Sequence, residues 1–153
     1  MKRGVLGEPF VFIFAMIVVA MLLFFGFKFT GELKDRGEFL ILSDSIIDLK
    51  NQVARYYSFD PGATKTVRLD LPNQVDEICF TNSERAMGEH PFSRIFKGTS
   101  NYNVFVFPLD AFKITRFNIP NLEPNVNPLC LKNIGKVEVL LVNKGDFVEI
   151  SGK

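Results

Sequence analysis

The chain has 153 residues, a formal net charge of +1, 17 phenylalanines and no tryptophan. This charge gives no reason to expect nucleic acid as a partner, and no run of lysine or arginine suggests a phosphate-binding surface. The length leaves room for one small domain beyond a terminal membrane segment.

The first predicted element is an unbroken apolar run at residues 10–27, which contains no charged, amide or hydroxyl side chain. As a helix it would be about 27 Å long, close to the thickness of a bilayer's hydrocarbon core. It is longer than the apolar region of a secretory signal peptide, and no A-x-A cleavage site follows it. We therefore predict a transmembrane helix. Lys2 and Arg3 precede it, so the positive-inside rule keeps the basic leader, residues 1–9, in the cytoplasm and the rest of the chain outside the cell membrane.

The second predicted element is an amphipathic helix within residues 28–59. Apolar residues recur there at steps of three and four, which places them on one helical face; they are Phe39, Leu42, Ile46, Leu49, Val53 and Tyr56. This face either docks on the outer domain, packs against other copies of the chain, or does both. The two helices can be continuous from about residue 9 to residue 57, with a bend or frayed turn near Thr30-Gly31. Asp60-Pro61-Gly62 should end the helix, since proline cannot continue it.

Residues 60–153 are expected to form a small antiparallel β-domain, because the apolar period changes from the helical one to two. The fold class is thus α+β: a long amino-terminal helix, transmembrane and then amphipathic, followed by the β-domain, with the helix covering the sheet. A helical turn is expected around 92–96, and a rigid exposed loop at the proline- and asparagine-rich segment 120–128. Strands are expected at 67–71, 75–81, 102–107, 111–119, and in a hairpin of 136–142 and 147–150.

Two cysteines, Cys79 and Cys130, lie in apolar, strand-like stretches of the outer domain. If that domain is outside the cell membrane, the compartment is oxidising and a disulfide between them is expected. The alternative is a pair of buried free thiols. Reactive chemistry is not indicated, because the spacing is not CxxC and nothing basic is adjacent to either residue.

The amino terminus resembles the class III signal of type IV pilins, archaeal pilins and archaellins. The residues that carry this resemblance are Lys2-Arg3-Gly4, then Val5-Leu6-Gly7-Glu8, followed by the apolar run. In that family a membrane peptidase cuts after a glycine that precedes the hydrophobic segment, and the retained helix packs in the core of the filament. The resemblance extends to the plan of a long helix followed by a β-domain with a disulfide.

The resemblance implies cleavage after Gly4, which would make Val5 the first residue, or otherwise after Gly7. It also implies that Glu8 neutralises the new amino group of a neighbouring subunit during assembly; a carboxylate among apolar helices is costly unless it is paired. Glu8 is four positions after Gly4, whereas bacterial members usually carry the acidic residue five positions after the cleaved glycine. The implied partners are membrane lipid, other copies of the chain, the prepilin peptidase and the filament assembly machinery.

The sequence gives little support for catalysis and predicts no enzyme activity, cofactor or metal. His90 is the only histidine and lies in a predicted loop, where a solvated side chain is the usual interpretation. Two functions stay open. One is a pilin-like structural subunit of a type IV-type surface filament. The other is a single-pass membrane protein that displays the β-domain for binding or as an accessory factor, without filament assembly.

Overall fold

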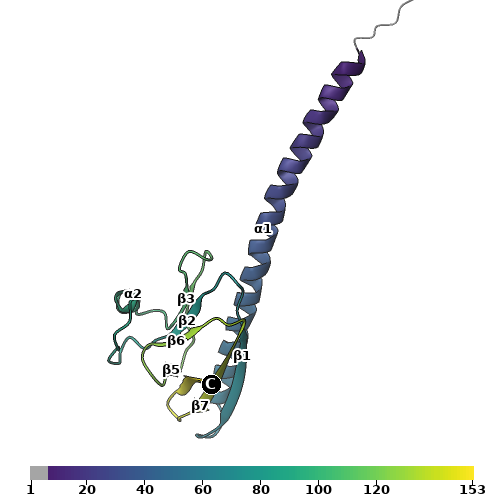
Figure 1. The fold of residues 1–153 in the computed structure, drawn as a ribbon. Helices are drawn as coiled ribbons and strands as arrows, with labels where there is room; N and C mark the ends of the chain where they lie inside the picture. Colours follow the sequence, from purple (N-terminus) through teal and green to yellow (C-terminus); the bar gives the residue numbers. More distant parts are fainter. Residues whose placement is uncertain (1–6) are drawn as a thin grey trace, which may run out of the picture. The chain divides into compact units, whose positions relative to one another are not determined.

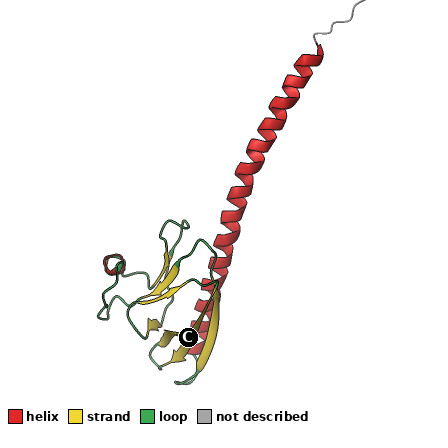
Figure 2. Cartoon of the chain, in the orientation of Figure 1, coloured by secondary structure: helices red, strands yellow, loops and turns green. Residues whose placement is uncertain are grey.

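The computed structural model describes residues 7–153, and the side chains of residues 7–9 and 30–35 are outside the description. Its elements are a long helix α1 (Gly7–Tyr57), a short helix α2 (Ser93–Lys97) and eight strands among the described residues, so the fold is α+β (Figure 1). The chain divides into two units, residues 1–37 and residues 38–153. The second unit contains the end of α1, α2 and all the strands (Figure 2).

α1 is continuous through the glycines at its middle, and the backbone remains helical at the predicted bend near Thr30-Gly31. The helix ends at Tyr57, where the sequence predicts its end, and Gly62 then takes a left-handed conformation with φ 95° that glycine adopts without a steric penalty. The Gly62 N–H donates to the carbonyl oxygen of Asn143 at 2.8 Å, which ties this turn to the carboxy-terminal hairpin.

The β-domain contains two four-stranded sheets rather than the single small antiparallel sheet that we expected. The first has the order β1 (Thr64–Asp70), β7 (Lys136–Asn143), β8 (Val148–Gly152) and β5 (Leu122–Pro124). The second has the order β4 (Arg116–Phe117), β3 (Val104–Phe107), β2 (Glu77–Phe80) and β6 (Leu129–Lys132). All pairings are antiparallel except that of β5 with β8, which is parallel.

One face of the carboxy-terminal part of α1 joins both sheets in a common apolar core. Leu42, Ile46, Leu49 and Val53 are buried with residues of β1, β2, β3, β7 and β8. Phe39 and Tyr56, at the two ends of the predicted stripe, are half-buried, and the Phe39 ring lies 5.8 Å from that of Phe112. The stripe therefore docks on the chain's own β-domain, the first of the two interpretations that the sequence left open.

Two predictions for the segment between β3 and β6 were wrong. Residues 111–119 form only the two-residue strand β4, because the chain turns after Phe107 and Thr115 bonds back to Leu109 through its hydroxyl at 3.1 Å. Residues 120–128 are not simply an exposed loop, because Leu122 and Pro124 are buried in β5. A proline is tolerated there because β5 is the edge strand of its sheet and an edge position can leave one side without a backbone donor.

Four asparagine side chains bridge segments that are distant in the chain. Each amide group donates to backbone carbonyls of another segment, while its oxygen accepts a backbone N–H; the residues are Asn103, Asn127, Asn133 and Asn143. Such bonds satisfy backbone groups that loops would otherwise leave without partners. The four asparagines therefore fix the loops between the strands.

Candidate functional site

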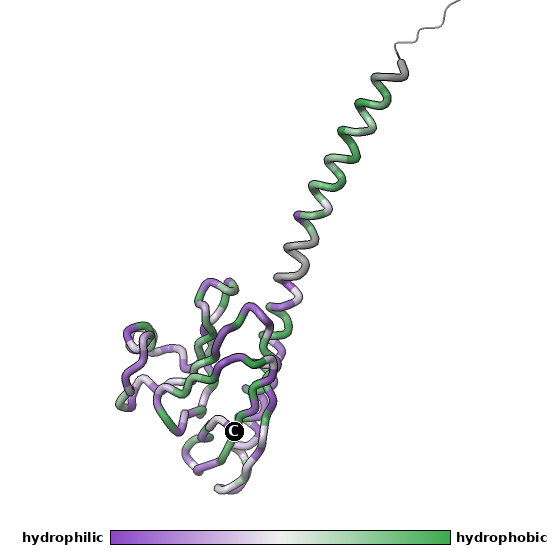
Figure 3. Tube along the Cα trace, in the orientation of Figure 1, coloured by the Kyte–Doolittle hydropathy of each residue, from purple (hydrophilic) through white to green (hydrophobic). Residues whose placement is uncertain are grey.

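The first candidate site is the exposed apolar surface of α1 in the first unit. Residues Phe10–Phe29 have a mean hydropathy of 2.9, and none of this segment is buried in the structure. The tube coloured by hydropathy shows the apolar segment as a nearly continuous green stretch (Figure 3). A helix of this length and composition is long and apolar enough to cross a membrane. An exposed apolar surface of this size indicates contact with lipid or with protein.

The residues that the pilin resemblance singles out lie at or before the start of α1. Gly4 and Val5 are outside the described residues. Gly7 begins the helix, which places Glu8 in its first turn, although the Glu8 side chain is outside the description.

The second candidate surface is the outward face of α1 between residues 38 and 57. Leu40, Ile41 and Ile47 are 60%, 48% and 54% exposed, while the opposite face is buried in the domain core. These apolar residues are not those of the predicted stripe. Leu40, Ile41 and Ile47 are therefore apolar residues that this helical segment leaves available for contact with another molecule, whereas the centre of the stripe is buried.

The third candidate site is the disulfide between Cys79 and Cys130. The two residues are direct partners in the antiparallel register of β2 and β6, with their Cα atoms 4.0 Å apart. The structure contains the predicted disulfide, so the alternative of two free thiols does not apply. Cys79 is fully buried, whereas Cys130 is half-buried.

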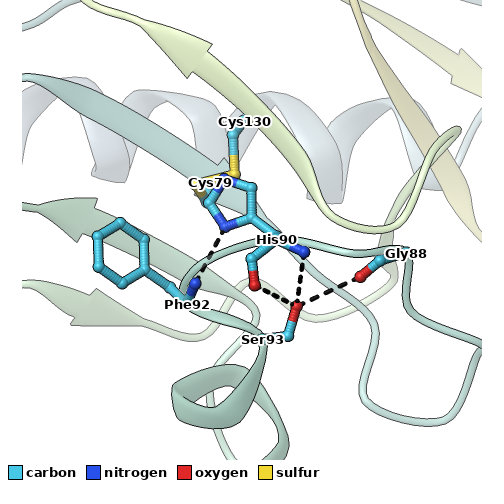
Figure 4. Close-up of a disulfide and its surroundings, with 6 residues drawn as sticks. All are labelled: Cys79, Gly88, His90, Phe92, Ser93 and Cys130. Carbon is cyan, nitrogen blue, oxygen red and sulfur yellow. Dashed lines mark hydrogen bonds between the residues drawn. A yellow bond between two sulfur atoms is a disulfide. The ribbon is translucent and has the colours of Figure 1, made fainter.

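His90 lies beside this disulfide, and the sequence did not predict that contact. One of its ring nitrogens and the two cysteine sulfurs all lie within 4.8 Å of one another. The imidazole is stacked on the ring of Phe96, with centroids 5.8 Å apart, and is tilted against Phe92. These contacts hold a half-buried histidine over the sulfur atoms (Figure 4).

The loop that carries His90 is fixed by Ser93. The His90 N–H donates to the Ser93 hydroxyl oxygen at 3.1 Å, and that hydroxyl lies 2.8 Å from the His90 carbonyl oxygen and 3.3 Å from that of Gly88. The Phe92 N–H donates to His90 Nδ1 at 3.4 Å. Since Nδ1 accepts a hydrogen, the neutral ring carries its proton on Nε2.

The histidine and the two sulfurs are the residue types of a zinc site, but the sulfurs are joined in a disulfide. Zinc binds cysteine as thiolate, and the ligating ring nitrogen must have no proton. The disulfide therefore opposes a metal ion at Cys79, His90 and Cys130 in this state of the protein.

An open groove beside the same loop is lined mainly by residues 87–91 and by α2. Its charged side chains are those of Glu89, Arg94 and Lys97. Because the groove is open and its charges have both signs, nothing in it specifies a ligand.

Comparisons with known proteins identified no relative: no family model matches the chain, and no curated protein or solved structure matches it significantly.

Proposed function

We propose that this chain is a pilin-like structural subunit of a type IV-type surface filament, anchored in the cell membrane before assembly. The observation that carries the proposal is that α1 combines a fully exposed apolar segment, Phe10–Phe29, with a segment from Glu38 that is docked on a β-domain. The first part of this helix is thus apolar on every side, and its second part is packed against the β-domain.

The apolar segment requires an apolar environment before and after assembly. In the membrane, lipid surrounds it, and its backbone groups are satisfied within the helix. Outside the membrane, other copies of the same segment supply an equally apolar surface. Helix–helix contact over about 30 Å then replaces contact with lipid.

The charged residues near the amino terminus support the same proposal. With Lys2 and Arg3 at the cytoplasmic side, the β-domain faces the outside, where the Cys79–Cys130 disulfide is chemically stable. After cleavage by a prepilin peptidase, the Glu8 carboxylate would pair with the new amino group of a neighbouring copy. An unpaired carboxylate among apolar helices is costly, so this pairing would favour the assembled register.

The outward apolar residues of the second unit extend the proposed contact surface. Leu40, Ile41 and Ile47 lie on the part of α1 that does not face the β-domain. In a filament these side chains would pack against helices of neighbouring copies. Their effect on assembly can be tested separately from the stability of the β-domain, because they lie outside its core.

The first test is the mass of the native protein from its source cells, both in membranes and in sheared surface filaments. The proposal expects a mature chain that lacks residues 1–4, or 1–7, and that is present in the filaments. A native chain that retains Met1 and stays in the membrane would refute the proposal and support the single-pass membrane protein that displays its β-domain.

The second test compares matched variants in the same cells. We expect Glu8→Ala and Ile47→Asp to abolish or strongly reduce filaments while the membrane level and the disulfide remain normal. Glu84→Ala and Ile134→Asp are the controls, because both residues are exposed in loops of the β-domain and outside α1, and they should assemble normally. Normal filaments with both test variants would contradict the proposed packing.

A further inference from the structure

We propose that the β-domain of the unassembled chain contacts the surface of the bilayer through two loops, residues 108–115 and residues 133–135. The isoleucines of these loops, Ile114 and Ile134, enter the lipid. The inference rests on the membrane anchoring in the proposed function, but it does not need the filament. The contact orients the domain and is not required for anchoring, so Ile134→Asp remains a suitable control for assembly.

Each loop carries an isoleucine that the core of the domain leaves uncovered. Ile114 is 52% exposed, in the loop between β3 and β4. Ile134 lies between β6 and β7 and is 86% exposed, the highest value for a large apolar side chain among the described residues. Moving such side chains from water into lipid is favourable, because it removes apolar surface from water.

The loop that contains Ile114 lies beside the start of α1 in the second unit. The Phe112 ring of this loop is 5.8 Å from the ring of Phe39, and the second unit begins at Glu38. The loop is therefore at the amino-terminal end of the helical segment 38–57. That end of the segment is the one from which the chain continues to the apolar residues Phe10–Phe29.

The loop that contains Ile134 is joined to the same end of the domain by the backbone of Asp76. The Asp76 N–H donates to the carbonyl oxygen of Phe107, where the first loop begins, and the Asp76 carbonyl oxygen accepts the Asn133 N–H, each at 2.7 Å. The segment that contains Asp76 follows β1, and the last residue of that strand, Asp70, accepts the Ser45 hydroxyl at 2.8 Å. Both loops are thus connected to the part of α1 that begins the second unit.

The length of chain between the apolar segment and the second unit brings the membrane within reach of these loops. Only residues 30–37 separate Phe29 from the second unit. This segment spans about 12 Å as a helix and reaches about 28 Å when fully extended. The headgroup layer of a bilayer extends about 5–8 Å beyond the hydrocarbon on each side. The tether therefore keeps the amino-terminal end of the second unit near the membrane surface.

The charges around the two loops favour a contact that does not select anionic lipid. Exposed lysines and aspartates occur there in equal number; they are Lys113, Lys132, Lys136, Asp70, Asp76 and Asp110. Balanced charges give no net attraction to an anionic surface. A lysine stem can nevertheless lie along apolar lipid while its ammonium group stays among the headgroups. We therefore assign the contact to the isoleucines and expect it with neutral lipid.

The experiment uses the absence of tryptophan from the chain, because a single introduced tryptophan then reports its own surroundings. Full-length Ile114→Trp and Ile134→Trp are reconstituted in phosphatidylcholine vesicles, with and without bromine atoms on the acyl chains near the headgroup. Bromine quenches a tryptophan that touches the lipid. Val126→Trp is the matched control: Val126 is 61% exposed and precedes β6, whereas Ile134 follows that strand, so the two residues lie beyond its opposite ends. Phe14→Trp, within the apolar segment, tests the anchoring itself.

We expect brominated lipid to lower the tryptophan fluorescence of Ile114→Trp and Ile134→Trp about twofold, because a residue at the headgroup boundary lies close to the bromine atoms. The fluorescence of Val126→Trp should not change. Addition of Ile114→Asp to the Ile134→Trp protein should weaken the quenching. If both loop variants behave like Val126→Trp while Phe14→Trp is quenched, the proposed contact is overturned and the proposed function stands. If Phe14→Trp is not quenched either, the chain is not anchored in the bilayer and both proposals fail.

Discussion

Asn143 joins the end of α1 to the β7–β8 hairpin, and its substitution offers the sharpest test of the fold. The side chain is 1% exposed. Its amide nitrogen donates to the carbonyl oxygens of Tyr56 and Phe59, each at 2.8 Å, and its oxygen accepts the Gly145 N–H at 2.7 Å. Each such bond contributes about 1 kcal/mol net, so Asn143→Ala should lower the free energy of unfolding by about 3 kcal/mol.

Asn143→Asp removes the two amide donors while it keeps the shape of the side chain. Aspartate keeps the acceptor for Gly145 but loses both donors, and it directs a carboxylate at the carbonyl oxygens of Tyr56 and Phe59. At pH 7 we expect it to cost at least as much as alanine, because a buried charge beside two acceptors is unfavourable. Asn125→Ala is the control, since Asn125 is exposed and its side chain makes one local bond, accepting the Val126 N–H at 2.9 Å.

The assay is urea denaturation of the full-length protein in detergent, followed by tyrosine fluorescence. The chain has no tryptophan and three tyrosines, of which Tyr56 and Tyr57 are at the end of α1 beside the substituted site. The control should change the free energy of unfolding by less than about 0.5 kcal/mol. A loss of less than about 1 kcal/mol in both Asn143 variants would refute the argument that this side chain fastens the helix to the sheet.

Three further predictions concern the core and the surface of the β-domain. Replacing both Cys79 and Cys130 by alanine opens a 51-residue loop and should lower the free energy of unfolding by about 4 kcal/mol on the chain-entropy model, measured by the same urea titration. Leu49→Ala, at a fully buried position, should cost about 2–5 kcal/mol and shift the urea midpoint accordingly. The hydrogen bond from Arg68 and its positive charge lower the pKa of Glu138 in the folded protein. The stability that this pair contributes is therefore complete above the pKa of Glu138 in the unfolded chain, and it is lost as pH falls through the lower pKa of the folded state. An NMR titration of Arg68→Ala should show a higher Glu138 pKa than in the wild type.

The elements that could be predicted from the sequence are those fixed by local pattern. The spacing of residues from Phe39 to Tyr56 indicates one helical face, and the structure buries that face in the domain core. Alternation of apolar and polar residues, with Gly145 in the turn, identifies the β7–β8 hairpin. In both cases the prediction depends on residues close together in the chain: three or four apart in the helix, or within one hairpin.

The elements that could not be predicted depend on contacts between distant segments. Proline is typical of loops, so Pro124 predicts a loop. It lies instead in β5, which is an edge strand only because it pairs in parallel with β8. Asparagine indicates a turn, yet the amide of Asn143 reaches a carbonyl 87 residues away. The contact of His90 with the disulfide likewise has no local signal, because it joins positions 79, 90 and 130.

The two parts of α1 are constrained by the chain's own fold to different degrees, and this difference decides which experiments are informative. Between residues 38 and 57 the β-domain occupies one face of the helix, so a substitution such as Leu49→Ala alters folding and any assembly together. Ile47, on the opposite face, can change assembly while the core of the domain stays intact. Within Phe10–Phe29 none of the described segment is buried, so under the proposed function its sequence is set by lipid and by other copies. A substitution in that segment that leaves β-domain stability unchanged but removes filaments would therefore report directly on the proposed helix packing.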